Sequence, residues 1–473
     1  MARFLGMVLN PMYVRQEGSE TVFGNLTRAG TTAVGIWPYV ERLSDEKHGS
    51  RVPDLHIDGE RRVLGRPLWG RRALYVQSYL AYTPEIALYE PGSYRPPAHL
   101  PPGPERDIVD ETIAEARARG LEVYLGVSPF TPPGTRSEDQ PLRVDGLRVQ
   151  PPYVARNACL NSPDARHYAL AMIQDTVQHY PQAGGLILDW VEYGAYRLAD
   201  LFTCFCRHCR QAAIEAGYGW KRIEEDVLAL WQRLHRLTAA DLEHARCLIA
   251  TEEALADLLS RHPGLMAFIR FKREVVGGFY REVRQLLDRL GIAGCSLTAR
   301  CWCSPWNHAS GSDYATLAGI CEVVSPKLFT FDHAALPRWY GQTLKEWNPA
   351  LAESDILETL LAWMQLPDSR TNRRLAQYRI PAPDESHPTN FEAYRRRIDE
   401  MVAQVDGRAK CLPIVHPYLP DDQWATMVTL VRDSRTDGMW VNMYGYSTDA
   451  KLKILAETWR TSNKMRETND YLD

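Results

Sequence analysis

The chain contains, at residues 185–194, the run Gly185-Leu186-Ile187-Leu188-Asp189-Trp190-Val191-Glu192-Tyr193-Gly194. Its first half is apolar, which is typical of a strand in a parallel sheet, because such strands are covered on both faces. Two carboxylates and an aromatic residue follow directly. We therefore expect Asp189 and Glu192 at the edge of a sheet where parallel strands end.

Strand-like and helix-like segments alternate along the rest of the chain. Helix signals include a segment from Ser19 to Ala29 that stops at Gly30, and a start at Ser162-Pro163 with serine as the N-cap. Eight strand-helix units predict an α/β fold, a (β/α)8 TIM barrel. The predicted strands cover residues 3–9, 32–37, 121–127, 185–190, 292–299, 321–331, 411–415 and 438–443.

Three segments exceed what a minimal barrel needs. We expect one catalytic barrel over residues 1–473, with a loop insertion at 40–104 after the second strand. We also expect an added helical subdomain at residues 217–263 and a partly helical insertion after the sixth strand at residues 340–397. Long insertions of this kind usually shape a binding face.

Charge and hydropathy narrow the classes of partner. The 473 residues include 55 Lys and Arg against 59 Asp and Glu, a net charge of -4. The chain lacks the excess of positive charge that is typical of proteins that bind nucleic acid or an anionic membrane, so we expect neither partner. The chain shows no signal-peptide pattern and no membrane-length apolar run, so we expect a cytoplasmic protein, with a homo-oligomer left open.

A cysteine cluster follows the carboxylates. Cys204-Phe205-Cys206-Arg207-His208-Cys209 holds three of the chain's ten cysteines, and Cys159 lies further upstream. Clustered cysteines in a reducing compartment are more often metal ligands than disulfides. Four thiolates would close a structural site, whereas three would leave room for a catalytic water on zinc.

The carboxylates indicate acid/base chemistry. Active sites of (β/α)8 barrels lie at the carboxyl ends of the strands, where Asp189 and Glu192 are expected. Glycosidic cleavage uses two carboxyl groups, one of which protonates the leaving oxygen. Asp332, which closes the predicted sixth strand, is a further candidate nucleophile or base. The alternative is that Asp189 pairs with an arginine of a neighbouring strand and Glu192 is solvated.

These motifs resemble those of glycoside hydrolase family 42 β-galactosidases. The similarity covers Cys159-Leu160-Asn161-Ser162-Pro163, then Glu192-Tyr193-Gly194, then the three clustered cysteines. It implies that Glu192 is the general acid/base and that structural zinc is bound by Cys159, Cys204, Cys206 and Cys209.

The chain departs from that family at two places. Val191 stands where the family has Asn, and the seventh strand, with His416 at its end, lacks the family's nucleophilic Glu. The second carboxylate is then Asp189 or Asp332. Asp189-Trp190-Val191-Glu192-Tyr193 also resembles the strand end of family 18 chitinases, which use the substrate's acetamido group as nucleophile.

Aromatic residues at several strand ends fit a sugar site, because pyranose rings stack on aromatic faces. Polar residues beside them can hydrogen-bond sugar hydroxyls or an acidic substituent. The candidate substrate-binding residues are Trp37, Tyr39, Arg300, Trp302, His416, Tyr418, Trp440 and Asn442, and Trp306 and Tyr444 share the same strand ends.

The chemistry and the resemblance together predict a glycoside hydrolase that cleaves a glycosidic bond of a small oligosaccharide or glycoside. Two alternatives remain at this stage. One is a non-catalytic carbohydrate-binding barrel that lacks the seventh-strand nucleophile. The other is a zinc-dependent hydrolase in which Cys159 lies away from the other three cysteines.

Overall fold

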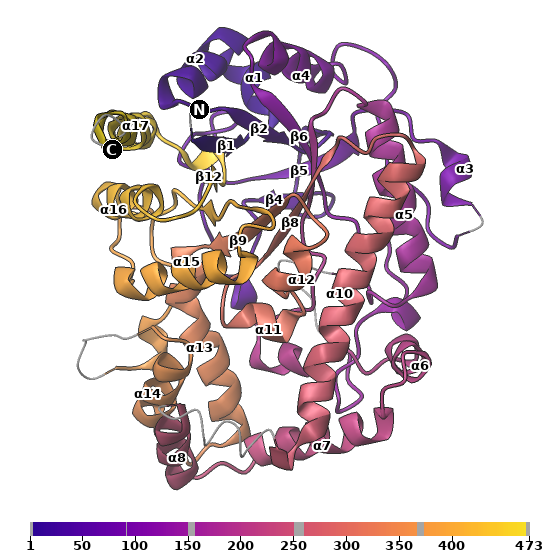
Figure 1. Cartoon of the computed structure of the whole chain (residues 1–473), viewed down its shortest axis with the longest axis vertical. Helices are drawn as coiled ribbons and strands as arrows, with labels where there is room; N and C mark the ends of the chain where they lie inside the picture. The colour runs from indigo at the N-terminus through magenta and orange to yellow at the C-terminus, as the bar shows by residue number, and fades with distance from the viewer. Residues whose placement is uncertain (1–2, 91, 150–156, 250–259, 367–372, 470–473) are drawn as a thin grey trace.

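Eight parallel strand positions close into a barrel in the computed structural model, which describes residues 3–90, 92–149, 157–249, 260–366 and 373–469 (Figure 1). The sheet runs in the order β10-β9-β11-β12-β1-β2-β6-β7-β8, and a further β9–β8 pairing closes it. The predicted (β/α)8 fold is therefore confirmed. The barrel strands are β1 Phe4–Val8, β2 Ala33–Ile36, β6 Glu122–Val127, β7 Gly185–Leu188, β8 Ser296–Trp302, β9 Val323–Leu328, β10 Lys410–Cys411, β11 Ile414–Val415 and β12 Gly438–Val441.

The seventh strand position is built from two short pieces. Both β10 and β11 pair with β9, on either side of Leu412-Pro413. Proline has no N–H to donate to a ladder, which interrupts regular pairing. The Pro413 carbonyl nevertheless accepts from Trp440 N over 2.9 Å, so the chain stays within the barrel wall.

Two strand predictions are wrong at their boundaries. The fifth strand is predicted over 292–299, whereas β8 covers Ser296–Trp302. It begins later because the preceding helix ends there: Gly291 takes φ +72°, and Ile292 N donates back to Leu287 O. The sixth was predicted to reach residue 331 but ends at Leu328, and a helix begins at Thr330. Asp332 therefore lies in the first turn of a helix and does not close a strand.

Helices surround the barrel, and their ends follow the predicted signals. The Ser162 side chain accepts from Ala165 N at the start of α5, and Gly30 caps α2 in the left-handed conformation. The α-helices are α1 Pro11–Glu17, α2 Ser19–Ala29, α3 Ile86–Tyr89, α4 Ile108–Ala118, α5 Pro163–His179, α6 Arg207–Glu215, α7 Trp220–Leu234, α8 Ala239–Ile249, α10 Pro263–Arg289, α11 Trp306–Ser310, α12 Tyr314–Ala318, α13 Thr330–Trp347, α14 Glu353–Trp363, α15 Phe391–Val405, α16 Asp421–Arg432 and α17 Asp449–Asn469.

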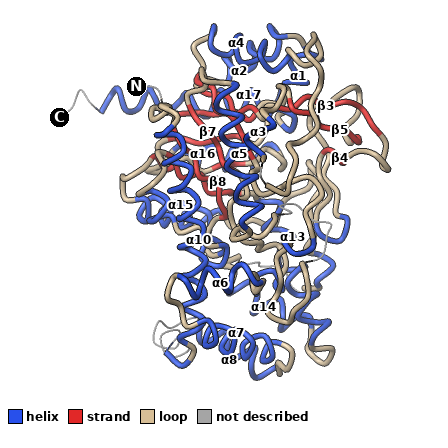
Figure 2. The backbone as a smooth tube through the Cα atoms, turned by 90° about the vertical axis from the view of Figure 1, so that its right-hand side faces the viewer, coloured by secondary structure: helices blue, strands red, loops and turns tan. Residues whose placement is uncertain are grey.

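Residues 40–104 carry a small antiparallel sheet outside the barrel. Its order is β3-β5-β4, from Tyr39–Ser44, Leu74–Leu80 and Ser50–Val52. Figure 2 shows this sheet at one side of the molecule. The connection from β4 to β5 carries His56 and Arg62, which are both buried.

Helices extend the molecule at the end opposite α1, α2 and α4. Figure 1 shows α7, α8 and α14 gathered there, and Figure 2 places α6 beside them. Arg246 of α8 donates to the Thr359 hydroxyl of α14 over 3.1 Å, which joins the segments 217–263 and 340–397. Residues 250–259 and 367–372 of those segments lie outside the described residues.

None of the helices within the described residues combines the length and the apolar character that a membrane crossing requires.

Candidate active site

One lysine bridges the two carboxylates that follow β7. Lys327 lies on β9, with its Nζ 3.1 Å from Asp189 Oδ1 and 2.9 Å from Glu192 Oε1. Burial opposes the charge of this ammonium, but Asp189 and Glu192 outweigh burial and raise the pKa of Lys327. Asp189 and Glu192 therefore both contact one ammonium, whose positive charge lies between them.

Glu192 is held by four donors. Its Oε2 accepts from Trp302 N over 2.8 Å, from Ser312 Oγ over 2.9 Å and from Ser310 Oγ over 3.3 Å, in addition to the Lys327 contact at Oε1. The residue is only 2% exposed. Both oxygens of the Glu192 carboxylate therefore accept from groups of the protein itself.

Asp189 also faces an arginine from the neighbouring strand. Arg300 Nη1, on β8, lies 3.7 Å from Asp189 Oδ2, and the guanidinium lies over the Trp37 ring at 5.3 Å from its centroid. Burial lowers the pKa of Arg300, although Asp189 opposes this shift. The buried Nε and Nη2 of Arg300 have no hydrogen-bond partner among the described residues. Because buried donors are normally paired, these two atoms are available to a ligand.

Asp332 sits in a different environment from Asp189 and Glu192. It is 3% exposed, accepts from Tyr196 Oη over 3.2 Å at Oδ2, and has its Oδ1 3.6 Å from His56 Nδ1. Burial raises the pKa of Asp332 to about 7, although the charge of Arg62 opposes the shift. Asp332 Oδ1 accepts no hydrogen bond from any described residue. The site therefore contains one carboxyl group that can hold a proton near neutral pH.

His416, which follows β11, lies in an aromatic cage with Arg62. Its Nε2 is 3.1 Å from Arg62 Nη1, and its ring contacts Phe331 and Tyr446 at 4.8 and 4.3 Å between centroids. Burial, reinforced by the charge of Arg62, lowers the pKa of His416 well below the usual range, so the imidazole is neutral.

The predicted aromatic and polar candidates divide into two groups. Trp37, Tyr39 and Asn442 are half-buried, while Trp302 and Tyr418 are buried. The Trp302 ring packs 4.6 Å from Tyr196, and Tyr418 packs 5.9 Å from Phe331, so both belong to this end of the barrel.

Trp440 does not join that site. It is 0% exposed, with its ring 5.1 and 5.2 Å from the rings of Phe4 and Tyr124. Phe4 begins β1, so Trp440 packs toward the amino end of the barrel and has no face free for a sugar. The expectation for Trp440 is wrong, because alternate strand residues point into the barrel and fill it. Trp306 and Tyr444 are buried as well.

The four predicted cysteines form one buried cluster. Cys159, Cys204, Cys206 and Cys209 have all their sulfur atoms within 4.8 Å of one another. Cys159 Sγ lies 3.3, 3.5 and 3.9 Å from the sulfurs of Cys206, Cys209 and Cys204. Four thiolates at 2.3 Å from a tetrahedral zinc would be separated by about 3.8 Å. The donor set therefore fits a closed tetrahedral metal site, and the alternative that places Cys159 elsewhere is wrong.

The surroundings of the cluster suit bound thiolates. Asn161 donates from its backbone N to Cys159 Sγ over 3.4 Å and from Nδ2 to Cys209 Sγ over 3.3 Å. Leu142 N lies 3.5 Å from Cys204 Sγ. Such second contacts orient metal ligands.

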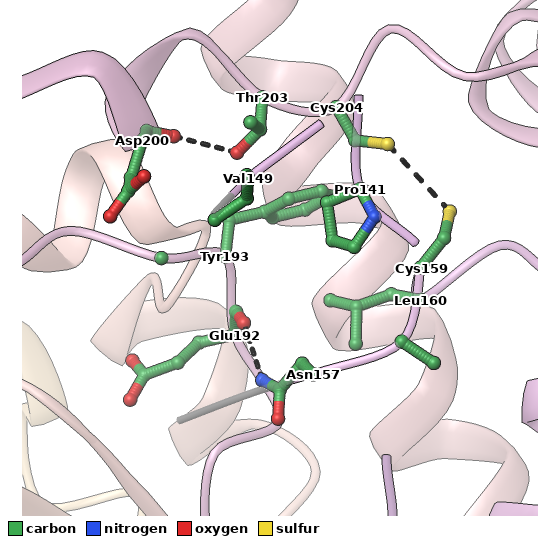
Figure 3. Close-up of a pocket in the computed structure, with 12 residues that line it drawn as sticks. Pro141, Val149, Asn157, Cys159, Leu160, Glu192, Tyr193, Asp200, Thr203 and Cys204 are labelled. Atoms are coloured by element: carbon green, nitrogen blue, oxygen red, sulfur yellow. Dashed lines mark hydrogen bonds between the residues drawn. The ribbon is translucent and has the colours of Figure 1, made fainter. Parts of the chain in front are cut away.

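A small pocket separates the cluster from Glu192. Figure 3 shows the Glu192 carboxylate pointing away from Cys159 and Cys204 across this pocket. The Asn157 side chain donates to the Glu192 carbonyl over 3.0 Å, and the Tyr193 hydroxyl lies 4.0 Å from Cys209 Sγ. The cluster therefore braces the backbone that carries Glu192 rather than facing its carboxylate.

The sequence patterns did not predict several residues of the site. Lys327 carried a usable signal, since a lysine inside the apolar strand β9 must find a buried partner. Tyr196 lies in a loop without a regular pattern. His56 and Arg62 lie in the 40–104 insertion, and nothing local connects them to the barrel.

No protein-family model and no curated protein matches the sequence. In fold, the chain is similar to the β-galactosidase from the psychrophilic Marinomonas ef1, with TM-score 0.54 and 13% identity over 99% of this chain and 60% of that chain. The polyextremophilic β-galactosidase from the Antarctic haloarchaeon Halorubrum lacusprofundi matches with TM-score 0.52 and 12% identity over 97% and 58% of the two chains. The β-galactosidase from Bacillus circulans sp. alkalophilus matches with TM-score 0.50 and 13% identity over 98% and 56%.

These matches confirm the resemblance in fold to glycoside hydrolases of the β-galactosidase kind. The chain spans less than two thirds of the length of these β-galactosidases. At such identities the similarity shows the fold alone, because one fold can carry many different reactions.

Proposed function

We propose that this chain is a glycoside hydrolase that acts on a small oligosaccharide or glycoside at the carboxyl end of its barrel. The observation that carries the proposal is the contrast between two carboxyl groups. Burial raises the pKa of Asp332 to about 7, whereas Asp189 lies beside the cations Lys327 and Arg300. Carboxyl groups in opposed environments are the arrangement that supplies an acid and an ionised partner together.

In this proposal Asp332 donates the proton to the leaving oxygen, and Asp189, beside Lys327 and Arg300, is the second carboxylate. Glu192 then positions Lys327, because its oxygens are already occupied by donors. Arg300 would bind the sugar through its free guanidinium N–H groups, and the half-buried Trp37 ring would hold that guanidinium in place. The family resemblance implies a different assignment, with Glu192 as the acid/base.

Leaving-group rescue separates the two assignments. Wild type, D332N and E192Q would be assayed for hydrolysis of a panel of alkyl glycosides and of the matching dinitrophenyl glycosides, with E392Q as control. Glu392 is 77% exposed, so E392Q should keep wild-type activity. Loss of a general acid costs about 10²- to 10⁴-fold, and a dinitrophenolate leaves without protonation. We expect D332N to recover on dinitrophenyl substrates and E192Q not to recover; the reverse would return the acid role to Glu192.

A non-catalytic sugar-binding barrel is the second candidate. It is favoured by the four donors around Glu192 and by His416, a residue without a carboxylate, at the end of the seventh strand. Glycosides that bind to the wild-type protein without any release of product would support it.

We also propose that the cysteine cluster holds one zinc ion. With all four coordination positions filled by sulfur, the metal would stabilise the loop after β7 and take no part in the reaction.

A further inference from the structure

Arg62 is a buried cation that forms no direct ion pair, although its charge acts on the nearby buried carboxyl group of Asp332. It is 9% exposed and forms no ion pair with any residue that the structure describes. Its guanidinium lies over the rings of Phe331 and Tyr446, at 4.6 and 5.4 Å from their centroids, and its Nε has no hydrogen-bond partner. Burying a charge is costly unless another group compensates it. Asp332 holds a proton near neutral pH and so compensates Arg62 only in part, which leaves Arg62 able to accept an anionic partner.

The hydrogen bonding of His416 leaves a donor unmatched beside Arg62. Tyr418 N points at His416 Nδ1 over 3.1 Å, and Arg62 Nη1 points at His416 Nε2, also over 3.1 Å. A neutral imidazole accepts at one nitrogen and donates at the other. Only one of the two N–H groups can therefore be accepted, and the other needs an acceptor from elsewhere.

His56 adds further unmatched capacity on the same aromatic surface. Its ring lies 5.6 Å from Phe331, the ring that also contacts Arg62, and neither of its nitrogens has a hydrogen-bond partner among the described residues. It is 2% exposed, packs 5.9 Å from Trp339 and has its Nδ1 3.6 Å from Asp332 Oδ1. A neutral His56 can donate one hydrogen bond to an acceptor on a bound ligand.

We propose that Arg62, His416 and His56 form a subsite for an anionic substituent of the sugar, either the carboxylate of a uronic acid or a sulfate ester. The inference rests on the proposed glycoside-hydrolase function and specifies its substrate class. A carboxylate or sulfate group offers only hydrogen-bond acceptors, which suits the unmatched donors described above. The planar guanidinium group of arginine matches the spacing of carboxylate and sulfate oxygens. The net charge of the whole chain does not oppose this, because recognition depends on the local groups.

Matched sugar pairs test the proposal by calorimetry. The pairs are methyl β-glucuronide with methyl β-glucoside, methyl β-galacturonide with methyl β-galactoside, and galactose 6-sulfate with galactose. We expect wild type to bind the charged member of at least one pair about tenfold more tightly, and R62Q to lose that preference while its affinity for the neutral member is kept. The control R42Q changes an exposed arginine of the same insertion, whose partner is Glu105, and should keep the preference.

The possible results test the anionic subsite and the proposed glycoside-hydrolase function separately. Equal or weaker binding of every charged member, with neutral sugars bound, overturns the anionic subsite and leaves the glycosidase proposal intact. A charge preference that survives in R62Q overturns the assignment to Arg62. Absence of binding of any of these sugars by folded wild type contradicts the proposed function and the subsite together. If R62Q does not fold, R62K and the decline of wild-type uronide affinity with added salt test the same point.

Discussion

Lys327 Nζ lies 2.9 Å from Glu192 Oε1, and the same ammonium lies 3.1 Å from Asp189 Oδ1. Two carboxylates that follow one strand would otherwise repel each other at close range. The lysine from β9 reduces this repulsion by placing a positive charge between them. The proton-holding role at this end of the barrel is assigned to Asp332, because burial raises its pKa to about 7 against the charges of Arg62 and Lys327.

Removal of the Lys327 ammonium should destabilise the protein strongly. K327M leaves Asp189 and Glu192 without their shared cation, and loss of one partner of a buried ion pair costs about 3–5 kcal/mol. Urea unfolding at pH 7 measures this cost. K453M is the control, because Lys453 is 75% exposed and its pair with Glu457 should contribute less than about 1 kcal/mol. Equal stability of the two variants would contradict the buried bridge.

The charge of Asp332 should leave a signature in the pH dependence of stability. With a folded pKa of about 7, above the value of an unfolded aspartate, the native state holds a proton that the unfolded state has lost between about pH 4 and pH 7. Stability contributed by this group is complete below the unfolded pKa and declines as pH rises through that window.

D332N removes that titration. The unfolding free energy of D332N should therefore rise relative to that of wild type as pH increases from 5 to about 7, by about 1.4 kcal/mol for each pH unit. Above about pH 7 the difference should stay constant. Denaturant unfolding of both proteins at several pH values gives the difference directly, and contributions from titratable groups remote from Asp332 cancel in it. A difference independent of pH would show that Asp332 is ionised throughout.

The cysteine cluster should bind one zinc ion per chain and stabilise the fold. Purified protein should contain one equivalent of zinc by elemental analysis, and C206S should lose both the metal and part of the thermal stability, because metal binding contributes folding free energy. C295S is the matched control, since Cys295 is buried outside the cluster. Loss of activity on chelation with unchanged stability would instead indicate a catalytic metal.

Two tryptophans should respond differently to replacement. W37A should weaken sugar binding about threefold to tenfold, because the Trp37 ring lies under the Arg300 guanidinium and holds it in place. W440A should cost about 3–5 kcal/mol of unfolding free energy, because Trp440 fills the barrel between Phe4 and Tyr124. Calorimetric titration and urea unfolding of both variants separate binding from packing. A larger loss of stability in W37A than in W440A would contradict the described packing.

Local patterns in the sequence were sufficient to predict the barrel and the cysteine cluster. Apolar runs, helix caps such as Ser162 and the clustered thiols are each encoded within a few residues, and the structure contains the closed barrel, the Ser162 cap and the thiol cluster. The boundary errors at Ile292 and Asp332 arise where tertiary packing decides whether a residue continues a strand or enters a helix.

The electrostatic character of the site could not be predicted in the same way. Arg62 and His56 reach the barrel from an insertion that is distant in sequence, and only the closed fold brings them to Phe331 and His416. A period-two pattern places Trp440 in a strand but does not say which end of the barrel its ring occupies. Such placements depend on contacts between strands that follow one another around the barrel.

A crystal structure of wild type soaked with a mixture of monosaccharides shows whether the carboxyl end of the barrel binds a sugar. We expect a sugar there, in contact with Arg300 and within hydrogen-bond distance of Asp189 or Asp332. A sugar bound only at some other surface, or a fully ordered site that stays closed to every sugar in the mixture, would contradict it.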